Sequence, residues 1–248
     1  MPGLRGEREA ATPSRLYAPE LGAAGSVLDL GADEAHYVTR VCRARAGDMA
    51  EATDGRGAIA RLKLVSVGAR VSAEVLSVDQ ARRGQRTWLW CGAPERGRAD
   101  WLVEKLAELG VERFQPLECR GEPWPAGEAR SHRWNRLAVA ALRQSRRAFL
   151  MEIGSPLPLE AALETVEPAA ALWVGDPAGR SAARGERPAN LEVGAIGPSG
   201  GFGARDHERL EAKGFVPIAL ADGRLRTETA ALSLASWLAL PRNVAPGG

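Results

Sequence analysis

The chain is poor in cysteine. Its 248 residues include three cysteines, Cys42, Cys91 and Cys119. They are odd in number, far apart in the sequence, and match none of the spacings that zinc-binding motifs use. A disulfide-stapled secreted fold and a structural zinc site are therefore not expected. The pattern favours reduced, mostly buried thiols in a cytoplasmic protein without a bound metal.

Long apolar segments are lacking as well. No stretch approaches the roughly 20 apolar residues that a membrane-spanning helix needs. The first 14 residues are polar and charged, without the apolar centre of a secretion signal. The sequence therefore predicts no membrane association, and it predicts tails at residues 1–14 and 242–248.

Several common catalytic motifs are missing. The sequence has no Gly-x-x-x-x-Gly-Lys-Ser/Thr loop and no His-Glu-x-x-His helix. These patterns place a phosphate-binding loop and a zinc-protease centre, respectively. The chemistries that depend on them fit this chain poorly.

An excess of charge of one sign is also absent. The net charge of +2 and the isoelectric point of about 8.6 neither require nor exclude nucleic acid as a partner. Nearly all basic residues are arginine, which suits phosphate and base contacts better than lysine. GC-rich coding would enrich arginine too, so composition leaves both explanations open. The 45% of hydrophobic residues allow one large folded domain or two small ones.

Residues 15–79 are predicted to form a small β-barrel or closed sheet. Short runs rich in Val and Leu are separated by turn-forming residues and by one helical segment, and we expect strands at 27–30, 49–53, 58–67 and 70–78 and a helix at 32–42. Three arginines, Arg40, Arg43 and Arg45, lie at the end of that helix. They form either a phosphate-binding patch or a solvated helix end whose cations complement the dipole. His36 alone would be a surface histidine.

A polar, basic linker is predicted at residues 80–86, and a second domain at 87–241. Apolar runs then alternate with helical patterns; we expect strands at 87–91, 114–117, 170–175, 191–197 and 215–220, and helices at 98–109, 131–149, 159–166, 205–213 and 227–240. Such alternation favours a parallel sheet with ligands at the carboxyl ends of its strands. Residues 176–190 are predicted to be a mobile surface loop. The last helix is small and apolar, which indicates a partner helix.

Two glycine-containing loops follow strands near the C-terminal end. The first is Ile196-Gly-Pro-Ser-Gly-Gly-Phe202, and the second runs from Leu220 to Arg226 before Thr-Glu-Thr-Ala. Glycines in such loops let backbone groups approach a ligand closely. Each loop could also be an ordinary turn from strand to helix, but two of them at matching positions favour a binding site.

These loops carry a resemblance to a known family. The first is similar to the pattern Ile/Val-Gly-Pro-Glu-Gly-Gly-Phe, and the second to Leu-Gly-x-Arg-Ile-Leu-Arg-Thr-Glu-Thr-Ala. Together they resemble the RsmE family, bacterial 16S rRNA uracil-N3 methyltransferases of the SPOUT superfamily. Further resemblances lie in the segment from His36 to Asp48, in Lys105 to Leu117, and in Gln144 with Arg147.

The resemblance implies a fold, a cofactor and partners. The fold would be α/β: an N-terminal PUA-like β-barrel and a C-terminal SPOUT methyltransferase domain with a trefoil knot. The partners would be 16S rRNA in the 30S subunit and a second copy of the chain. RNA contacts would come from His36, Arg40, Arg43, Arg45 and Arg147, although Arg147 could instead belong to a basic helix end that complements the dipole. S-adenosyl-L-methionine would be bound by Ile196, Gly197, Pro198, Ser199, Gly200, Gly201, Leu220, Ala221, Gly223, Leu225 and Thr229.

The implied reaction requires a cation near the uracil oxygens, because negative charge spreads over O2 and O4 when the N3 proton leaves. Arg226 directly follows the second loop and is the candidate for this role. Glu228 could accept the proton, or it could be a first-turn acid that stabilises its helix. Three departures from the family patterns, Ser199, Ala221 and Gly223, keep a second hypothesis open: a catalytically silent RNA-binding module.

Overall fold

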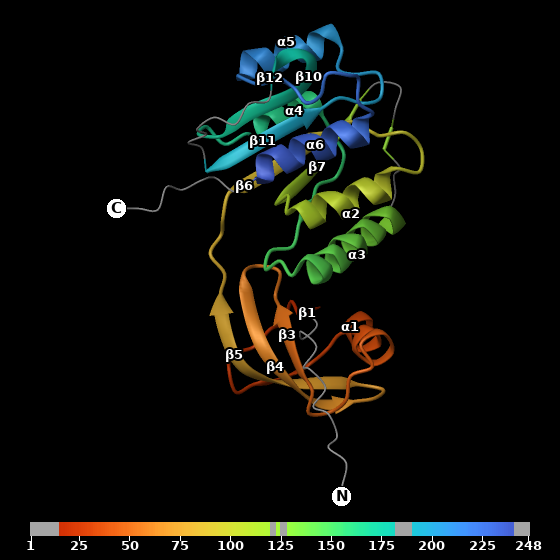
Figure 1. The fold of residues 1–248 in the computed structure, drawn as a ribbon, viewed down its shortest axis with the longest axis vertical. Coiled ribbons are helices and arrows are strands. Elements are labelled where there is room, and N and C mark those ends of the chain that lie inside the picture. Colours follow the sequence, from red (N-terminus) through yellow and green to blue (C-terminus); the bar gives the residue numbers. More distant parts are fainter. Residues whose placement is uncertain (1–14, 120–122, 125–127, 182–189, 241–248) are drawn as a thin grey trace, which may run out of the picture. The chain divides into compact units, whose positions relative to one another are not determined.

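A computed structural model describes residues 15–119, 123–124, 128–181 and 190–240, and the chain divides into two compact units (Figure 1). The first unit comprises residues 1–82 and 142–149, and the second comprises 83–141 and 150–248. The sequence did not predict that residues 142–149 belong with the first unit. The predicted tails lie outside the described residues.

The first unit contains a five-stranded sheet in the order β1-β3-β4-β5-β2. Side chains of its long central strands alternate, and Leu62, Leu64, Ala73 and Val75 on the inner face are almost fully buried. Within the described residues no ladder joins the edge strands β1 and β2, so the sheet is open and the closed barrel expected from the sequence is not found. Each edge strand has three residues and pairs with one neighbour only. The strands are β1 (Arg15–Tyr17), β2 (Val27–Asp29), β3 (Met49–Thr53), β4 (Ala58–Val67) and β5 (Val71–Gln80).

The predicted helical segment of this unit is present in two parts. Helix α1 (Ala32–His36) continues directly into a π-helical turn, η1 (Tyr37–Val41). Glu34 of α1 is buried and pairs with Arg143 at 2.7 Å, and the Arg143 guanidinium lies 4.4 Å from the centre of the Tyr37 ring. Burial raises the pKa of Glu34, against the opposing effect of Arg143. Arg143 therefore stabilises the fold of the first unit.

Helix α3 (Glu128–Ser145) ends four residues before its predicted end. Arg146 adopts a φ of 54°, in the left-handed region, and this conformation stops the helix. The residues that follow are bonded within the first unit: the Thr53 hydroxyl donates to the Ala148 carbonyl at 3.0 Å, and the Gly57 N–H donates to the same carbonyl at 3.1 Å. These bonds explain why the segment belongs to the first unit.

The second unit contains a parallel sheet in the order β12-β10-β11-β6-β7-β8, with β9 also paired to β7. The predicted loop 176–190 is partly wrong, because β10 continues to Ser181. Its pairing with β12 is interrupted after Gly175 and resumes at Arg180 and Ser181, and residues 182–189 lie outside the described part. The strands are β6 (Arg86–Cys91), β7 (Arg113–Glu118), β8 (Glu152–Ile153), β9 (Leu157–Pro158), β10 (Ala171–Ser181), β11 (Leu191–Ile196) and β12 (Val216–Ala219).

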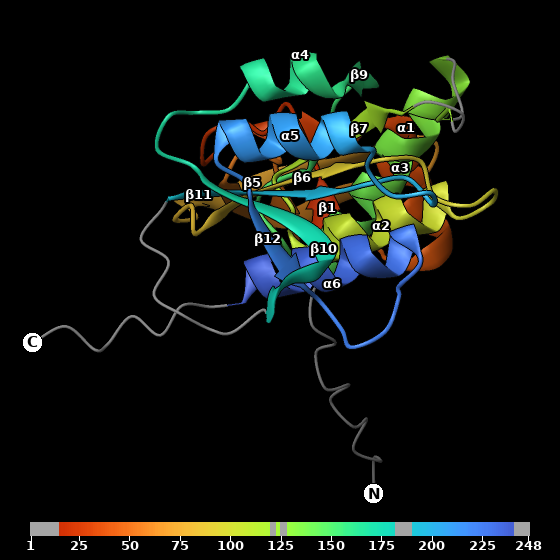
Figure 2. The same ribbon diagram turned by 90° about the horizontal axis from the view of Figure 1, so that it is seen from above.

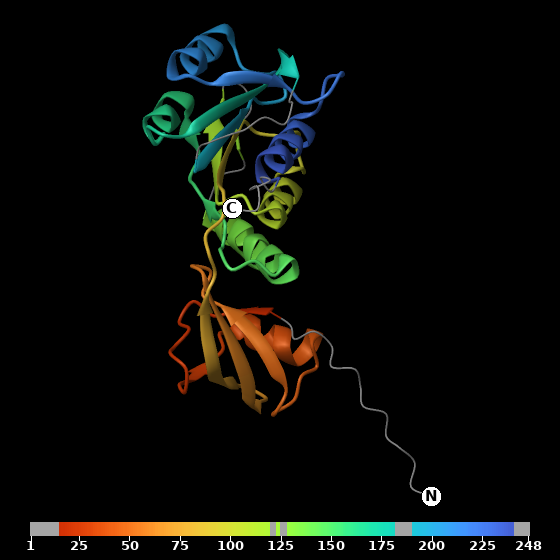
Figure 3. The ribbon, with the colours of Figure 1, turned by 60° about the vertical axis from the view of Figure 1, so that its left-hand side comes forward.

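Helices cover both faces of this sheet (Figures 2 and 3). Helices α2 (Ala99–Leu109) and α6 (Thr227–Ala239) pack on one face, while α4 (Leu159–Glu164) and α5 (Ala204–Lys213) pack on the other. Because strand side chains alternate, Leu89 and Cys91 of β6 belong to the hydrophobic core on the face covered by α2 and α6. Trp88 and Trp90 belong to the core on the opposite face, covered by α4 and α5. The predicted α/β architecture is confirmed.

The three cysteines, all among the described residues, form no disulfide. Cys91 is fully buried, and burial raises the pKa of its thiol, so the thiol stays neutral. Cys42 and Cys119 are only partly buried, which corrects the expectation of mostly buried thiols. Among the described helices none is long and apolar enough to cross a membrane.

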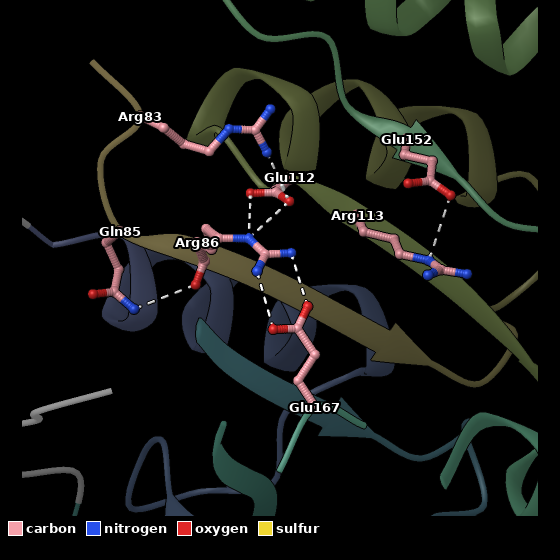
Figure 4. A network of polar contacts seen from close by, with 7 residues as sticks. All are labelled: Arg83, Gln85, Arg86, Glu112, Arg113, Glu152 and Glu167. Atoms are coloured by element: carbon pink, nitrogen blue, oxygen red, sulfur yellow. Dashed lines mark hydrogen bonds and ion pairs between the residues drawn. The ribbon is translucent and has the colours of Figure 1, made fainter. Parts of the chain in front are cut away.

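An ion-pair network lies at the amino-terminal ends of β6 and β7 (Figure 4). Arg86 bonds Glu112 at 3.1 Å and Glu167 at 3.0 Å, and Arg83 reaches Glu112 as well. The Arg86 guanidinium also lies 5.7 Å from the centre of the Trp88 ring. This edge of the sheet is opposite to the one that carries the glycine loops, so the network stabilises the fold.

Arg86→Ala is expected to lower the free energy of unfolding by roughly 1–3 kcal/mol, because it leaves a half-buried carboxylate of Glu112 without its main partner. Urea unfolding measures the loss. The control is Arg209→Ala, which breaks an exposed pair with Glu160 and is expected to cost less than about 1 kcal/mol. Equal losses in the two variants would contradict a stabilising role for the network.

Candidate cofactor and acceptor site

Three loops and residues 175–177 of β10 gather at the carboxyl edge of the parallel sheet. The loops follow β12, β11 and β6, and β10 lies between β12 and β11. In a parallel sheet such neighbouring ends form the usual ligand crevice. The sequence predicted the loops after β11 and β12 as a binding site and missed the contributions of β10 and of the loop after β6.

The loop after β11 is held by backbone contacts. The Gly92 N–H donates to the Ile196 carbonyl at 2.9 Å, and the Gly201 N–H donates to the Pro198 carbonyl at 2.8 Å. A Cβ atom on Gly197 would lie 2.7 Å from the Phe202 nitrogen, and Gly201 has a φ of 81°. The loop therefore needs glycine at 197 and 201.

The loop after β12 contacts the first loop through Arg224. Its Nη2 donates to the Ser199 carbonyl at 3.1 Å. Ala221, where the family pattern has glycine, is compatible with this loop: among the described non-glycine residues only Arg43 and Arg146 have a positive φ. Helix α6 begins directly after this loop, at Thr227.

The two loops enclose one side of a pocket. Most of the residues expected to bind the cofactor line it, whereas Gly200 and Thr229 are not among its lining residues. Sequence reasoning missed the contribution of β10. The pocket is lined by Gly175, Asp176, Pro177, Ile196, Gly197, Pro198, Ser199, Gly201, Leu220, Ala221, Gly223, Arg224, Leu225, Thr227 and Ala230.

Asp176 is the acidic side chain of this pocket. Its Oδ1 accepts a hydrogen bond from the Ala178 N–H at 2.8 Å, and its other oxygen lies 3.7 Å from Nδ1 of His207 on α5. In the sequence, Asp176 directly follows the apolar run that ends at Gly175, which is a position typical of a ligand-binding residue. It was instead assigned to the predicted mobile loop 176–190.

Arg226 lies at a second, adjoining pocket, lined by Glu95, Ser199, Arg224, Leu225, Arg226 and Thr227. Its guanidinium forms an ion pair with Glu95 at 2.6 Å, and Glu95 belongs to the loop after β6. Glu228 is buried, lines neither pocket, and lies 3.8 Å from Arg98. Glu228 therefore lies in the first turn of α6, where a carboxylate stabilises the helix. This position fits the second of the two roles considered for Glu228, and not the role of proton acceptor.

The predicted RNA-binding residues all belong to the first unit. The exposed side chains lie at the end of α1 (His36), within η1 (Arg40) and just beyond η1 (Arg43 and Arg45). Arg147 belongs to the same unit although it is distant in sequence. Across the described residues no ion pair links Arg40, Arg43 or Arg45 to a carboxylate. Among the residues that the structure describes, no three or more His, Cys, Asp or Glu side chains lie together in a group that could hold a metal ion.

Comparison with known proteins identifies the family. Residues 82–239 match the RNA methyltransferase domain family. The chain belongs to this family. One relative, the ribosomal RNA small subunit methyltransferase E of Aquifex aeolicus, is 32% identical over 147 residues, which cover 56% of this chain and 61% of the relative. The protein of the same name from Synechocystis is 28% identical over 214 residues, covering 83% of this chain and 70% of the relative.

Solved structures show the same fold. A ribosomal RNA small subunit methyltransferase E from Neisseria gonorrhoeae, bound to S-adenosyl methionine, has a TM-score of 0.83 and 24% identity over 91% of this chain and 96% of that one. A probable rRNA-methyltransferase from Porphyromonas gingivalis has a TM-score of 0.79 and 26% identity over 91% and 96%. The family match thus covers the unit that carries both pockets.

Proposed function

We propose that this chain methylates N3 of a uracil in bacterial 16S rRNA, using S-adenosyl-L-methionine, in the cytoplasm. The observation that carries the proposal is the pocket formed by the loops after β11 and β12, with Arg226 at an adjoining pocket. The family of the domain and the names of the relatives support the same activity.

The residues of the first pocket fit this cofactor. Ile196, Leu220 and Leu225 supply apolar surface for an adenine ring, and the glycine loop leaves its backbone accessible to the ring edge. Asp176 offers carboxylate oxygens for ribose hydroxyls and a negative charge for a cationic ligand. When bound, the cofactor would supply the methyl group of its sulfonium centre to N3 of the base and remain as a neutral thioether, and the N3 proton would pass to solvent.

The role proposed for Arg226 is electrostatic. Loss of the N3 proton places negative charge on O2 and O4 of uracil, and a guanidinium fixed beside one of these oxygens stabilises that charge as it develops. Arginine remains protonated, so Arg226 cannot be the base. Glu228 stabilises the start of α6 by pairing with Arg98.

The activity is tested by mass spectrometry of small-subunit rRNA from a strain that lacks the gene. We expect one 3-methyluridine to disappear and to return when the gene is restored. Calorimetry with purified protein is expected to show binding of S-adenosyl-L-methionine and of its demethylated product. Unchanged rRNA together with no cofactor binding would favour the silent RNA-binding module.

We further propose the domain organisation that the resemblance implies: a PUA-like RNA-binding domain at 15–79, a linker at 80–86 and a knotted SPOUT domain at 87–241. The open five-stranded sheet with α1 supports the first. Strand order supports the second, because β11 lies between β10 and β6, which both precede it in the chain. When a strand is inserted between two earlier strands in this way, the segment that follows it can pass through a loop formed by the earlier part of the chain, which is how a knot forms.

RNA binding by the first unit predicts a dependence on salt. Replacing Arg40, Arg43 and Arg45 together with alanine is expected to weaken rRNA binding and to reduce the slope of log K against log salt by roughly 0.7–0.9 for each phosphate group that the variant no longer neutralises. A double Arg205→Ala/Arg209→Ala variant, which removes exposed arginines of α5, is the control. An unchanged slope in the triple variant would contradict the proposed patch.

A homodimer is proposed through α2 and α6. Apolar side chains line a groove between these helices, including Trp101, Leu109, Leu232 and Trp237, and Trp101 is 42% exposed. A two-fold interface buries the same patch on both copies.

Trp101→Asp is expected to give a monomer at micromolar concentration in light scattering, because a carboxylate at the centre of an apolar interface would be buried without a partner. The control is Leu76→Asp, which changes a similarly exposed apolar residue of the first unit. A monomeric wild-type chain, or a dimeric Trp101→Asp variant, would contradict this interface.

A further inference from the structure

The second pocket shares part of its wall with the first. Ser199, Arg224, Leu225 and Thr227 line both, whereas Glu95 and Arg226 line only the second. A group in the second pocket therefore lies beside whatever occupies the first. Arg224 fixes the shared wall through its hydrogen bond to the Ser199 carbonyl.

Two ion pairs connect the loop after β6 to the loop after β12 and the start of α6. Glu95 pairs with Arg226 at 2.6 Å, and Arg98 pairs with Glu228 at 3.8 Å. The second pair includes the buried carboxylate of Glu228, and it anchors the base of the loop. The Gly92 N–H bond to Ile196 anchors the other end.

The Glu95–Arg226 pair is exposed, with side chains 52% and 62% accessible. Exposed pairs contribute little to stability. The pair can nevertheless fix the direction of a long, flexible guanidinium, which would otherwise sample many rotamers in water. The main effect of the Glu95–Arg226 pair is therefore to fix the orientation of the Arg226 side chain.

We propose that the second pocket receives the target pyrimidine and that Glu95 is the positioning residue that holds Arg226 there. This inference rests on the proposed function. Glu95 engages one nitrogen of the guanidinium, and the other N–H groups remain for a carbonyl oxygen of the base. Uracil presents such an oxygen at C4. Cytosine presents an amino donor there, so two donors would face each other, and the site discriminates against it.

The test compares Glu95→Gln with Glu160→Gln. Glutamine keeps the size of the side chain and removes its charge. Glu160 is a matched control, since it is 53% exposed and pairs with Arg209 at 2.7 Å away from both pockets. At saturating rRNA and cofactor, Glu95→Gln is expected to lower the single-turnover rate roughly 10- to 100-fold, as a small misplacement of a reacting group does. Glu160→Gln should match the wild type, and calorimetry should show the same cofactor affinity in all three proteins.

A double-mutant cycle separates positioning from a general effect on the loop. In an Arg226→Ala background, Glu95→Gln is expected to cause no further loss of rate, because the group that it positions is gone. Binding of a transcript with cytosine at the target position, measured by fluorescence, should be weaker than binding of the uracil transcript. Glu95→Gln should reduce that difference.

Two results overturn the inference while leaving the proposed function intact. In one, the wild type methylates rRNA and Glu95→Gln behaves as Glu160→Gln does. In the other, the losses from Glu95→Gln and Arg226→Ala are additive. A wild-type chain that neither binds the cofactor nor methylates rRNA would overturn both proposals.

Discussion

Replacing Arg226 with alanine is expected to lower the single-turnover rate of methyl transfer by roughly 10²–10³-fold, the scale of losing one donor to a developing oxyanion. The guanidinium lies in the second pocket and is held by Glu95 at 2.6 Å. Cofactor affinity is expected to change little, because Arg226 does not line the first pocket. Rapid-quench kinetics with saturating 30S particles or rRNA measures the rate.

Arg226→Lys is the informative companion variant. Lysine keeps the positive charge but loses the planar fork, which can hold Glu95 and a base oxygen at once. We expect it to recover only part of the lost rate. If Arg226→Ala instead raises KM while turnover at saturating RNA is preserved, then Arg226 only binds the RNA backbone and has no part in the chemical step.

Gly197→Ala is expected to weaken cofactor binding roughly 10- to 100-fold, since forcing an extra methyl group into a packed site costs about 1–3 kcal/mol. A Cβ at this position would lie 2.7 Å from the Phe202 nitrogen and 2.8 Å from the Gly201 carbonyl carbon. Both are backbone atoms, so the loop must move to accept the methyl group. Isothermal calorimetry with the demethylated cofactor measures the loss without requiring catalysis.

The same loop provides the control for Gly197→Ala. A Cβ on Gly200 would meet nothing within 4 Å, and this glycine does not have a positive φ. Gly200→Ala is therefore expected to bind the cofactor as the wild type does. Equal affinities for the two variants would show that the loop tolerates displacement at Gly197, and that its shape in the structure is not required for binding.

The sequence by itself determined most of the helices and strands, though not the short β1, β8 and β9, and the location of the first pocket. Apolar runs and the glycines after them placed β11 and β12, and α2 ends at Gly110 with a φ of 81°, as its capping position predicts. These are local features: each depends on a few neighbouring residues, whose spacing and conformational preferences are visible in the sequence. The paired loops were identified in the same way, whereas the role expected for Arg226 followed from the family resemblance that these loops carry.

Only the tertiary structure decided which distant residues meet. Glu95 and Arg226 are 131 positions apart, and Glu34 and Arg143 are 109 apart. Neither pair leaves a periodic pattern, because a salt bridge requires only two complementary side chains at the right place in space. The same reason applies to Asp176, which reaches the pocket because β10 lies between β11 and β12. Strand order sets these contacts, and it depends on packing of the whole sheet, which no local stretch of sequence specifies.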